Sequence, residues 1–385
     1  LLLGLPWELL HDGDGYLFQG AKPTRVRRRL PNTRSLDVSV VAAPIRVLLV
    51  TARPEDEACG YLDHRASALP LVEAMEQLGG LVRLHVLSPP TFDALGKELK
   101  RAFDARAPYH VVHFDGHGVY DRRVGLGGLC FEDPRDTDKL DRRRHVTVHT
   151  DKLGPLLKDY RIPLVFLEAC QTAQAEDTSE SVASELLQRG VASVVAMSHS
   201  VLVETARRFV ETFYAGLAHG QRVGDAMLDG QRGLKDDTFR GRIFGAGELR
   251  LEDWFVPVLF QEKDDPQLFR STPAPQTQED LRTILASRLG GLPEEPKTGF
   301  IGRSRELLAL QRLLTQARSA SKCVDAQGTH LLAPRACMYA VVRGQGGEGK
   351  TALAAEFARW LVRSQQMRRA AFVSVETHSH AAAVL

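Results

Sequence analysis

The chain has 385 residues, which is too long for one ordinary globular domain and predicts two or three. Hydrophobic residues make up 43% of the chain and charged residues 25%, which excludes a disordered chain, a coiled coil and a collagen-like repeat. The formal net charge of +2 is too small for a polyanion-binding protein, so nucleic acid is not an expected partner.

The first 35 residues are expected to form a leading hairpin or lid. Six basic residues and no acid lie between Lys22 and Arg34. These side chains could contact phosphates, but the alternation of Arg25, Val26 and Arg27 also suits an edge strand. We expect the solvated edge strand.

From Ile45 onward, short apolar runs alternate with amphipathic stretches. The apolar runs predict strands at residues 45–50, 81–87, 109–114, 163–167, 191–197 and 254–260. The amphipathic stretches predict helices near residues 64–79, 91–106, 181–189, 203–219 and 222–235. Apolar strands separated by helices are typical of a parallel sheet that is buried on both faces. Residues 36–261 are therefore expected to have a doubly wound α/β fold. Together with the leading segment they make up a first domain of residues 1–261.

Residues 262–298 differ from this pattern, because prolines are spaced among charged residues around a short helical stretch at 279–289. This composition predicts a linker. A second domain is then expected over residues 299–385, with strands at 338–343 and near 370–375.

No segment predicts a membrane span or export. No apolar run approaches the roughly 20 residues that a transmembrane helix needs, and the leucine-rich opening lacks the basic flank and cleavage signal of a secretory peptide. The five cysteines are widely spread, with no CxxC pair of the kind that serves zinc or redox sites. We therefore expect a cytoplasmic protein with reduced thiols, one of which is a candidate nucleophile.

Two predicted strands of the first domain end in reactive side chains. The strand at 109–114 runs into Asp115-Gly116-His117-Gly118, and the strand at 163–167 runs into Glu168-Ala169-Cys170. In an open α/β sheet, ligands and chemistry collect outside the carboxyl ends of the strands, so His117 and Cys170 are expected to meet. The imidazole would raise the thiolate fraction of Cys170 and supply a proton to a leaving amine.

The glycines beside His117 are expected to permit a tight turn and the close approach of a peptide backbone. The backbone N–H groups of Gly118 and Cys170 are candidate oxyanion donors. The alternative makes Cys170 a buried apolar residue and His117 a turn histidine, but the joint placement of the two residues favours catalysis. His113 is expected to point into the core. No site is predicted for a further group of cysteines and histidines, which are Cys59, Cys130, His145, His149 and His199.

In the second domain, residues 344–351 match the spacing GxxxxGKT between a predicted strand and a helix, the context that a P-loop requires. The glycines let backbone N–H groups converge on a phosphate at the positive end of the helix. In such a loop Lys350 reaches the outer phosphates and the Thr351 hydroxyl ligates magnesium. We therefore expect ATP and Mg²⁺ as cofactors, with phosphate contacts from Gly344, Gly346, Gly347, Gly349, Lys350 and Thr351.

The segment Phe300-Ile301-Gly302-Arg303 ahead of the P-loop resembles the opening of STAND-type signalling ATPases. This resemblance implies a nucleotide-gated switch and adds Arg303 to the nucleotide-binding residues. A P-loop domain needs several more strands, and the chain lacks an initiator methionine, so we expect it to be trimmed at both ends. The metal-binding acid and any sensor arginine that hydrolysis needs are expected beyond Leu385.

Five segments of the first domain, in order along the chain, carry a second resemblance. They are residues 5–10, 47–54, 111–118, 167–171 and 190–197. Over about residues 1–261 they look like the CHAT peptidases, which are cysteine proteases related to caspases and separases. The resemblance implies a caspase-like fold with a mostly parallel sheet and endopeptidase activity, with His117 and Cys170 as the catalytic pair. Family members with a C-terminal STAND ATPase look like prokaryotic antiviral defence or death-signalling proteins, and the resemblance implies such a role here.

Glu168 lies two residues before Cys170, where the related metacaspases carry an acid that helps to bind a basic P1 side chain. Asp115 and the acidic segment 176–180 could add to a negative cleft, although the acids of 176–180 also suit the first turn of the following helix. We therefore expect a substrate with arginine or lysine at P1, bound with the help of Asp115 and Glu168.

The resulting hypothesis is a cysteine endopeptidase that cleaves a partner protein, encoded nearby, under the control of the nucleotide-binding module. The full-length protein is expected to form a homo-oligomer on activation. An alternative is a catalytically silent adaptor that binds a peptide and is assembled by an ATP-driven switch. In a third reading the ATPase is the principal activity and the first domain is its regulator.

Overall fold

The structure is a computed structural model in two compact units, residues 1–275 and 276–385. It describes residues 5–20, 22–29, 38–121, 123–171, 178–199, 202–243, 247–262, 264–270, 278–296, 299–320 and 339–374. Only the backbone is described at residues 66–67, 169–171, 178–181, 243, 278–279, 282 and 316–320.

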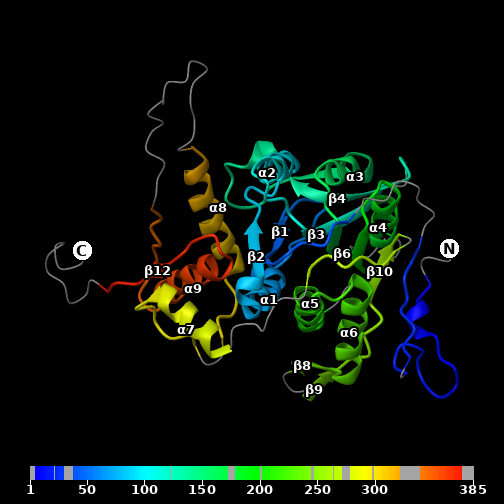
Figure 1. The fold of residues 1–385 in the computed structure, drawn as a ribbon. Coiled ribbons are helices and arrows are strands. Elements are labelled where there is room, and N and C mark those ends of the chain that lie inside the picture. Colours follow the sequence, from blue (N-terminus) through cyan, green and yellow to red (C-terminus); the bar gives the residue numbers. More distant parts are fainter. Residues whose placement is uncertain are drawn as a thin grey trace. The chain divides into compact units, whose positions relative to one another are not determined.

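The described part of the first unit is built around an eight-stranded sheet (Figure 1). Six of its strands follow one another in the order β10 (Pro257–Gln261), β7 (Ser193–Met197), β6 (Leu164–Gln171), β3 (Val111–Asp121), β1 (Ile45–Thr51) and β2 (Val82–Val86). All neighbours in this order are parallel except β10, which runs antiparallel to β7. Each of these strands comes from a predicted apolar run, so the mostly parallel sheet is confirmed.

Two further strands, β4 (Leu126–Glu132) and β5 (His145–His149), were not predicted. β4 pairs antiparallel with the last five residues of β3, and β5 pairs antiparallel with β4. Because of this pairing β3 continues to Asp121, and the tight turn expected at His117 is wrong. Gly116 instead serves close packing, since a Cβ there would lie 3.0 Å from the Phe114 ring and 3.1 Å from the carbonyl oxygen of Ala52.

Helices cover both faces of the sheet (Figure 1). They are α1 (His64–Gln77), α2 (Phe92–Asp104), α3 (Thr150–Asp159), α4 (Thr178–Gln188), α5 (Val203–Ala218) and α6 (Val223–Asp236). On one face, α2, α3 and α4 bury Leu95, Leu157 and Leu186 in the same apolar cluster as Phe114. On the other face, the Phe209 and Phe213 rings of α5 pack against Phe166 of β6. All of these helices except α3 were predicted. Because helices cover both faces of the sheet, its central strands can be apolar on both sides.

The N-terminal segment packs against the edge of this sheet. The backbone N–H of Arg28 donates to Leu259 at 2.8 Å, and that of Gln261 donates to Arg28 at 3.0 Å. Arg28 therefore lies beside β10 as an edge residue, but its side chain is buried in an ion pair with Glu8 at 2.6 Å. The expectation of a solvated basic edge is wrong at this residue, because the charge is balanced within the fold. Residues 1–4, 21 and 30–35 of the predicted hairpin or lid lie outside the described residues.

The remaining elements in the described part of the first unit are short. They are a hairpin of β8 (Phe239–Ile243) and β9 (Gly247–Arg250) and three 3-10 helices at Trp7–Leu9, Gly79–Leu81 and Pro134–Asp136. After β10, residues 264–270 stay with this unit, since Phe269 is buried and bridges to Val41. The predicted linker 262–298 is thus shared between the two units. Among the described residues, no helix has the length and apolar character that crossing a membrane requires.

The second unit contains three described helices and a small parallel pair of strands. They are α7 (Gln278–Arg288), β11 (Leu289–Gly290), α8 (Ser304–Ala320), α9 (Lys350–Arg363) and β12 (Ala370–Ala371). The strand predicted at 338–343 is wrong over its described residues, because none of 339–343 pairs with another strand there. Tyr339 and Val341 are accordingly exposed, where a central strand would bury them. The strand predicted near 370–375 is reduced to two residues.

Candidate active site

The structure places His117 and Cys170 on neighbouring strands. They are Cα partners in the parallel pair of β3 and β6, and Cys130 of β4 is the partner of His117 on the opposite side. His117 is therefore the middle residue of a row that crosses three strands. Of Cys170 only the backbone is described, and its side chain lies outside the described part of the structure.

The imidazole of His117 is held by a backbone carbonyl. Its Nε2 lies 2.8 Å from the carbonyl oxygen of Gly60, in the loop before α1. A carbonyl oxygen can only accept, so Nε2 carries the proton and Nδ1 keeps a lone pair in the neutral ring. Nδ1 is buried and has no hydrogen-bond partner among the described residues. Burial lowers the pKa of His117, which favours this neutral form at pH 7.

Asp115, two residues before His117 on β3, is paired inside the fold. Its carboxylate forms an ion pair with Arg53, and both side chains are buried. Arg53 also donates to the backbone oxygen of Asp115 at 2.7 Å. The negative charge of Asp115 is therefore balanced by a neighbouring cation. The sequence suggested instead that this charge would contribute to an open negative cleft.

Glu168 is the register partner of Asp115 on β6. Its Oε2 lies 3.1 Å from Nε2 of His113, whose Nδ1 lies 3.1 Å from the hydroxyl of Tyr214 on α5. Burial, together with the nearby charge of Asp115, raises the pKa of Glu168 well above its usual range. The prediction that His113 points into the core is confirmed, since the ring is fully buried and stacks on Phe166, and burial lowers its pKa to about 3.

The two candidate oxyanion donors lie within the sheet. Gly118 belongs to β3 and has Leu129 of β4 and Gln171 of β6 as its register partners. Cys170 lies one residue before the end of β6. Both stay candidates, because Gly118 directly follows His117 and the other N–H group belongs to Cys170 itself.

A second cluster of reactive side chains was missed by the sequence. The ligand atoms of Cys59, Cys130 and His145 all lie within 4.8 Å of one another. A hydrogen bond to Cys130, reinforced by burial, raises the pKa of Cys59, and the same bond lowers the pKa of Cys130. These residues come from a loop and two strands that the sequence did not predict, so no local spacing could have revealed them.

In the second unit, the segment that the sequence predicts to be a P-loop lies at the beginning of α9. Lys350 is the first residue of the helix and Gly349 is its N-cap, with φ at +77°. Gly347 also has a left-handed φ, at +80°, a conformation that glycine adopts at little cost. The N-cap offers no side-chain hydrogen bond to the first turn, so backbone N–H groups are available at the positive end of α9.

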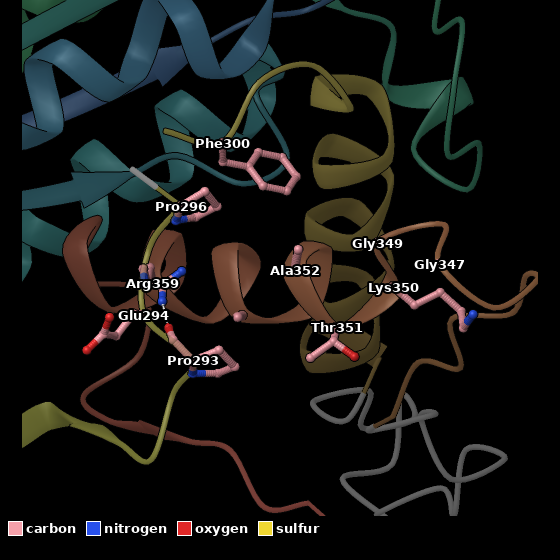
Figure 2. Close-up of a pocket in the computed structure, with 11 residues that line it drawn as sticks. Pro293, Glu294, Pro296, Phe300, Gly347, Gly349, Lys350, Thr351, Ala352 and Arg359 are labelled. Atoms are coloured by element: carbon pink, nitrogen blue, oxygen red, sulfur yellow. Dashed lines mark hydrogen bonds between the residues drawn. The ribbon is translucent and has the colours of Figure 1, made fainter. Parts of the chain in front are cut away.

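A cavity of about 420 Å³ adjoins this loop (Figure 2). Figure 2 shows Lys350 and Thr351 at the first turn of α9, with Phe300 and Pro296 beside the helix. Lys350 Nζ donates to the carbonyl oxygen of Gln345 at 2.5 Å, and Arg303 donates to that of Glu348 at 2.5 Å. The predicted nucleotide-binding residues on the loop and Arg303 therefore lie together, and the donors fit a phosphate group.

Comparisons with known proteins give three findings. The family model of the CHAT domain matches residues 1–267. Among solved structures, the Drosophila initiator caspase Dronc is 10% identical, with 64% of this chain and 90% of that chain covered and a TM-score of 0.33. Caspase-1 from Spodoptera frugiperda is also 10% identical, with 65% and 98% covered and a TM-score of 0.35. TM-scores this low do not establish a shared fold. No curated protein matches the chain.

Proposed function

The chain belongs to the CHAT domain family, and on this premise we propose that its first unit is a cysteine endopeptidase that cleaves a partner protein. The observation that carries the proposal is the register of β3 and β6, in which His117 and Cys170 are Cα partners. Neighbouring strands lie about 4.8 Å apart, a separation that an imidazole and a thiol can bridge. Two residues of the required chemistry thus occupy adjoining positions although they are distant in the sequence.

The proposed chemistry begins with His117 in the tautomer that Gly60 selects. Nδ1 accepts the thiol proton of Cys170, and the resulting thiolate attacks the scissile carbonyl carbon. The imidazolium then gives this proton to the leaving amine, and water hydrolyses the thioester and restores the thiol. The carbonyl oxygen of Gly60 stabilises the imidazolium, because it accepts a hydrogen bond from the Nε2–H group throughout the reaction. Gly118 and Cys170 remain the candidate N–H donors to the oxyanion.

The experiment that tests the proposal is incubation of the protein with candidate partners encoded beside it. We expect new N-termini in a partner protein, mapped by mass spectrometry, and none with Cys170→Ala. A partner that is bound equally by both forms and cut by neither would contradict the peptidase and support the adaptor instead.

We propose further that the substrate has arginine or lysine at P1 and that Glu168 recognises it. The raised pKa of Glu168 reflects burial and the nearby negative charge of Asp115, and a cationic P1 side chain would offset both. Ionisation would then accompany binding, so kcat/KM for such a peptide should rise with pH through that raised pKa. Asp115 contributes indirectly, because its negative charge helps to raise the pKa of Glu168.

Glu168→Ala should therefore lower kcat/KM for a basic-P1 peptide by roughly 10- to 100-fold, the loss of one hydrogen bond to a charged group. Alkylation of Cys170 by iodoacetamide should survive, since the thiol is untouched. Glu168→Gln is the matched control for packing, because it keeps the shape and the contact to His113 but loses the charge. Equal cleavage of the basic peptide by wild type and both variants would dispose of the idea.

For the second unit we propose binding of ATP with Mg²⁺ at the P-loop. The support is the uncapped start of α9, the left-handed Gly347 and Gly349, and the adjoining cavity. Lys350 would exchange its contact with Gln345 for the outer phosphates, and the Thr351 hydroxyl would ligate the metal. When bound, the nucleotide would supply the differential binding energy that a switch requires.

We propose that this switch regulates the peptidase, as part of prokaryotic antiviral defence or death signalling, with a homo-oligomer as the activated form. The presence of both units in one chain and the STAND-like segment at 300–303 support this proposal. If the switch regulates the peptidase, the full-length protein should cleave a partner only when the nucleotide is bound.

A further inference from the structure

Three residues outside the proposed dyad converge beside it. Cys59 lies in the loop before α1, Cys130 in β4 and His145 at the start of β5, and their ligand atoms are all within 4.8 Å of one another. Both cysteines are fully buried, and the side chain of His145 is 25% exposed. The cluster is therefore enclosed on the cysteine side and reachable from solvent on the histidine side.

Strand pairing accounts for two of the three positions. Cys130 is the register partner of Thr147 on β5. His145 lies two residues before Thr147, and residues two apart on a strand project to the same face of the sheet. The imidazole and the thiol of Cys130 are consequently placed on one face by the β4–β5 pairing alone.

Asp56 holds the other parts of the cluster in place. Its Oδ2 accepts from the ring Nδ1 of His145 at 2.6 Å and from the backbone N–H of the same residue at 2.8 Å. Its Oδ1 accepts from the backbone N–H of Cys59 at 3.0 Å. One carboxylate thus fixes the loop that carries Cys59 and the ring of His145 together. Because Nδ1 donates to Asp56, the remaining nitrogen, Nε2, has the lone pair.

We propose that Cys59, Cys130 and His145 bind one Zn²⁺ ion, with Asp56 as the partner that orients the histidine. Two cysteine sulfurs and one imidazole nitrogen form a known zinc ligand set, with a fourth position left for water. With Zn–S near 2.3 Å and Zn–N near 2.0 Å, the ligand atoms of a tetrahedral site lie roughly 3.5–3.8 Å apart. The ligand atoms of this cluster lie within 4.8 Å of one another, so metal binding requires them to approach one another by roughly 1 Å at most.

Charge and ligand softness favour zinc over the alternatives. Two thiolates balance one divalent cation, so the metal would neutralise charges that are otherwise costly in a buried place. Thiolate ligands disfavour Mg²⁺ and Ca²⁺, which take oxygen. A disulfide between Cys59 and Cys130 would use the two sulfurs, but it would not account for the imidazole of His145 beside them or for its hydrogen bond to Asp56. A carboxylate bound to the far nitrogen of a histidine is the usual support of a metal-ligating imidazole.

The site lies next to the proposed dyad. Cys59 precedes Gly60, whose carbonyl holds His117, and Cys130 is the register partner of His117 on β4. A zinc ion would therefore tie the loop that orients the imidazole to the strand beside it. This consequence rests on the proposed peptidase, whereas zinc binding itself does not and is measured without any substrate.

The first experiment measures metal in the whole chain, prepared in reductant without oxygen and loaded with Zn²⁺ or Co²⁺. We expect one zinc per chain by elemental analysis and, with Co²⁺, the thiolate charge-transfer and visible bands of a tetrahedral site. Cys130→Ser and His145→Gln should each lose the metal. The matched controls are Cys170→Ser and His149→Gln, which replace the same residue types on β6 and on β5 and should keep it.

A milder variant keeps the test valid if Cys130→Ser, a substitution of a buried residue, fails to fold. Asp56→Asn should weaken Zn²⁺ binding by roughly 10- to 100-fold, the usual effect of removing a partner of a metal-bound histidine, with circular dichroism unchanged. No uptake of Zn²⁺ or Co²⁺ by wild type would overturn the proposal, and so would undiminished binding in His145→Gln. A Cys59–Cys130 disulfide found in place of metal in the oxygen-free preparation would overturn it as well.

Discussion

His117→Ala is expected to slow peptide cleavage by about 10³-fold or more, because the variant loses both the base that ionises the thiol and the acid that protonates the leaving amine. Cys170→Ala should be at least as slow, since it lacks the nucleophile. Groups that act as one unit are strongly non-additive. The double variant should therefore be no slower than Cys170→Ala alone, as measured by kcat/KM on one peptide.

The pH profile provides an independent check on the same residue. Burial lowers the pKa of His117, so the free enzyme keeps a neutral base at pH values where an exposed histidine, with a pKa of about 6.5, is already protonated. The acid limb of kcat/KM should accordingly lie below that value. His149→Ala, on β5, is the matched histidine control and should keep full activity. Undiminished cleavage by His117→Ala would contradict the proposed dyad, whatever the behaviour of the metal site.

Lys350→Ala is expected to weaken ATP binding by roughly 10- to 100-fold, which corresponds to the loss of a hydrogen bond to a charged group, about 1.5–3 kcal/mol. The ammonium group lies at the start of α9, where the helix dipole adds to its attraction for phosphate. Isothermal titration calorimetry with a non-hydrolysable ATP analogue and Mg²⁺ measures the affinity directly.

The matched control for this change is Arg363→Ala, which removes a cation from the opposite end of the same helix. Arg363 pairs with Glu295 at 3.0 Å and does not line the cavity. The affinity of the Arg363→Ala variant for the nucleotide should equal that of wild type. If both variants bound ATP as tightly as wild type, the P-loop would not be the nucleotide site, and regulation by this module would fall with it.

Local patterns predicted most of the first unit. The apolar runs that became β1, β3, β6, β7 and β10 are buried along most of their described length, which requires a nearly unbroken series of apolar residues. β2 differs, because buried and exposed residues alternate along it. His117 and Cys170 each follow one of the predicted apolar runs by three residues, which is why their meeting on neighbouring strands could be anticipated from the sequence. The sequence also singled out Asp115 and Glu168, but it did not predict their contacts with Arg53 and His113.

The errors have a common cause. β5 has exposed or half-buried residues at four of its five positions, so it lacks the continuous apolar run on which the strand predictions rested. It is a strand because β4 supplies its hydrogen bonds. β3 extends beyond Phe114 for the same reason. Residues 339–343 are apolar enough for a strand, but without a neighbouring strand in the described part of the chain they do not form one.

By itself the sequence determined the alternation of strands and helices, the strands on which His117 and Cys170 lie, and the glycine and lysine spacing of residues 344–351. Each of these is a property of neighbouring residues and is therefore visible as a period or a motif. Only the tertiary structure decided that Gly60 selects the tautomer of His117, that Arg53 balances Asp115, and that Cys59, Cys130 and His145 meet. Those contacts depend on how β3, β4 and β5 pair, and hydrogen bonds between distant segments leave no repeating pattern in the chain.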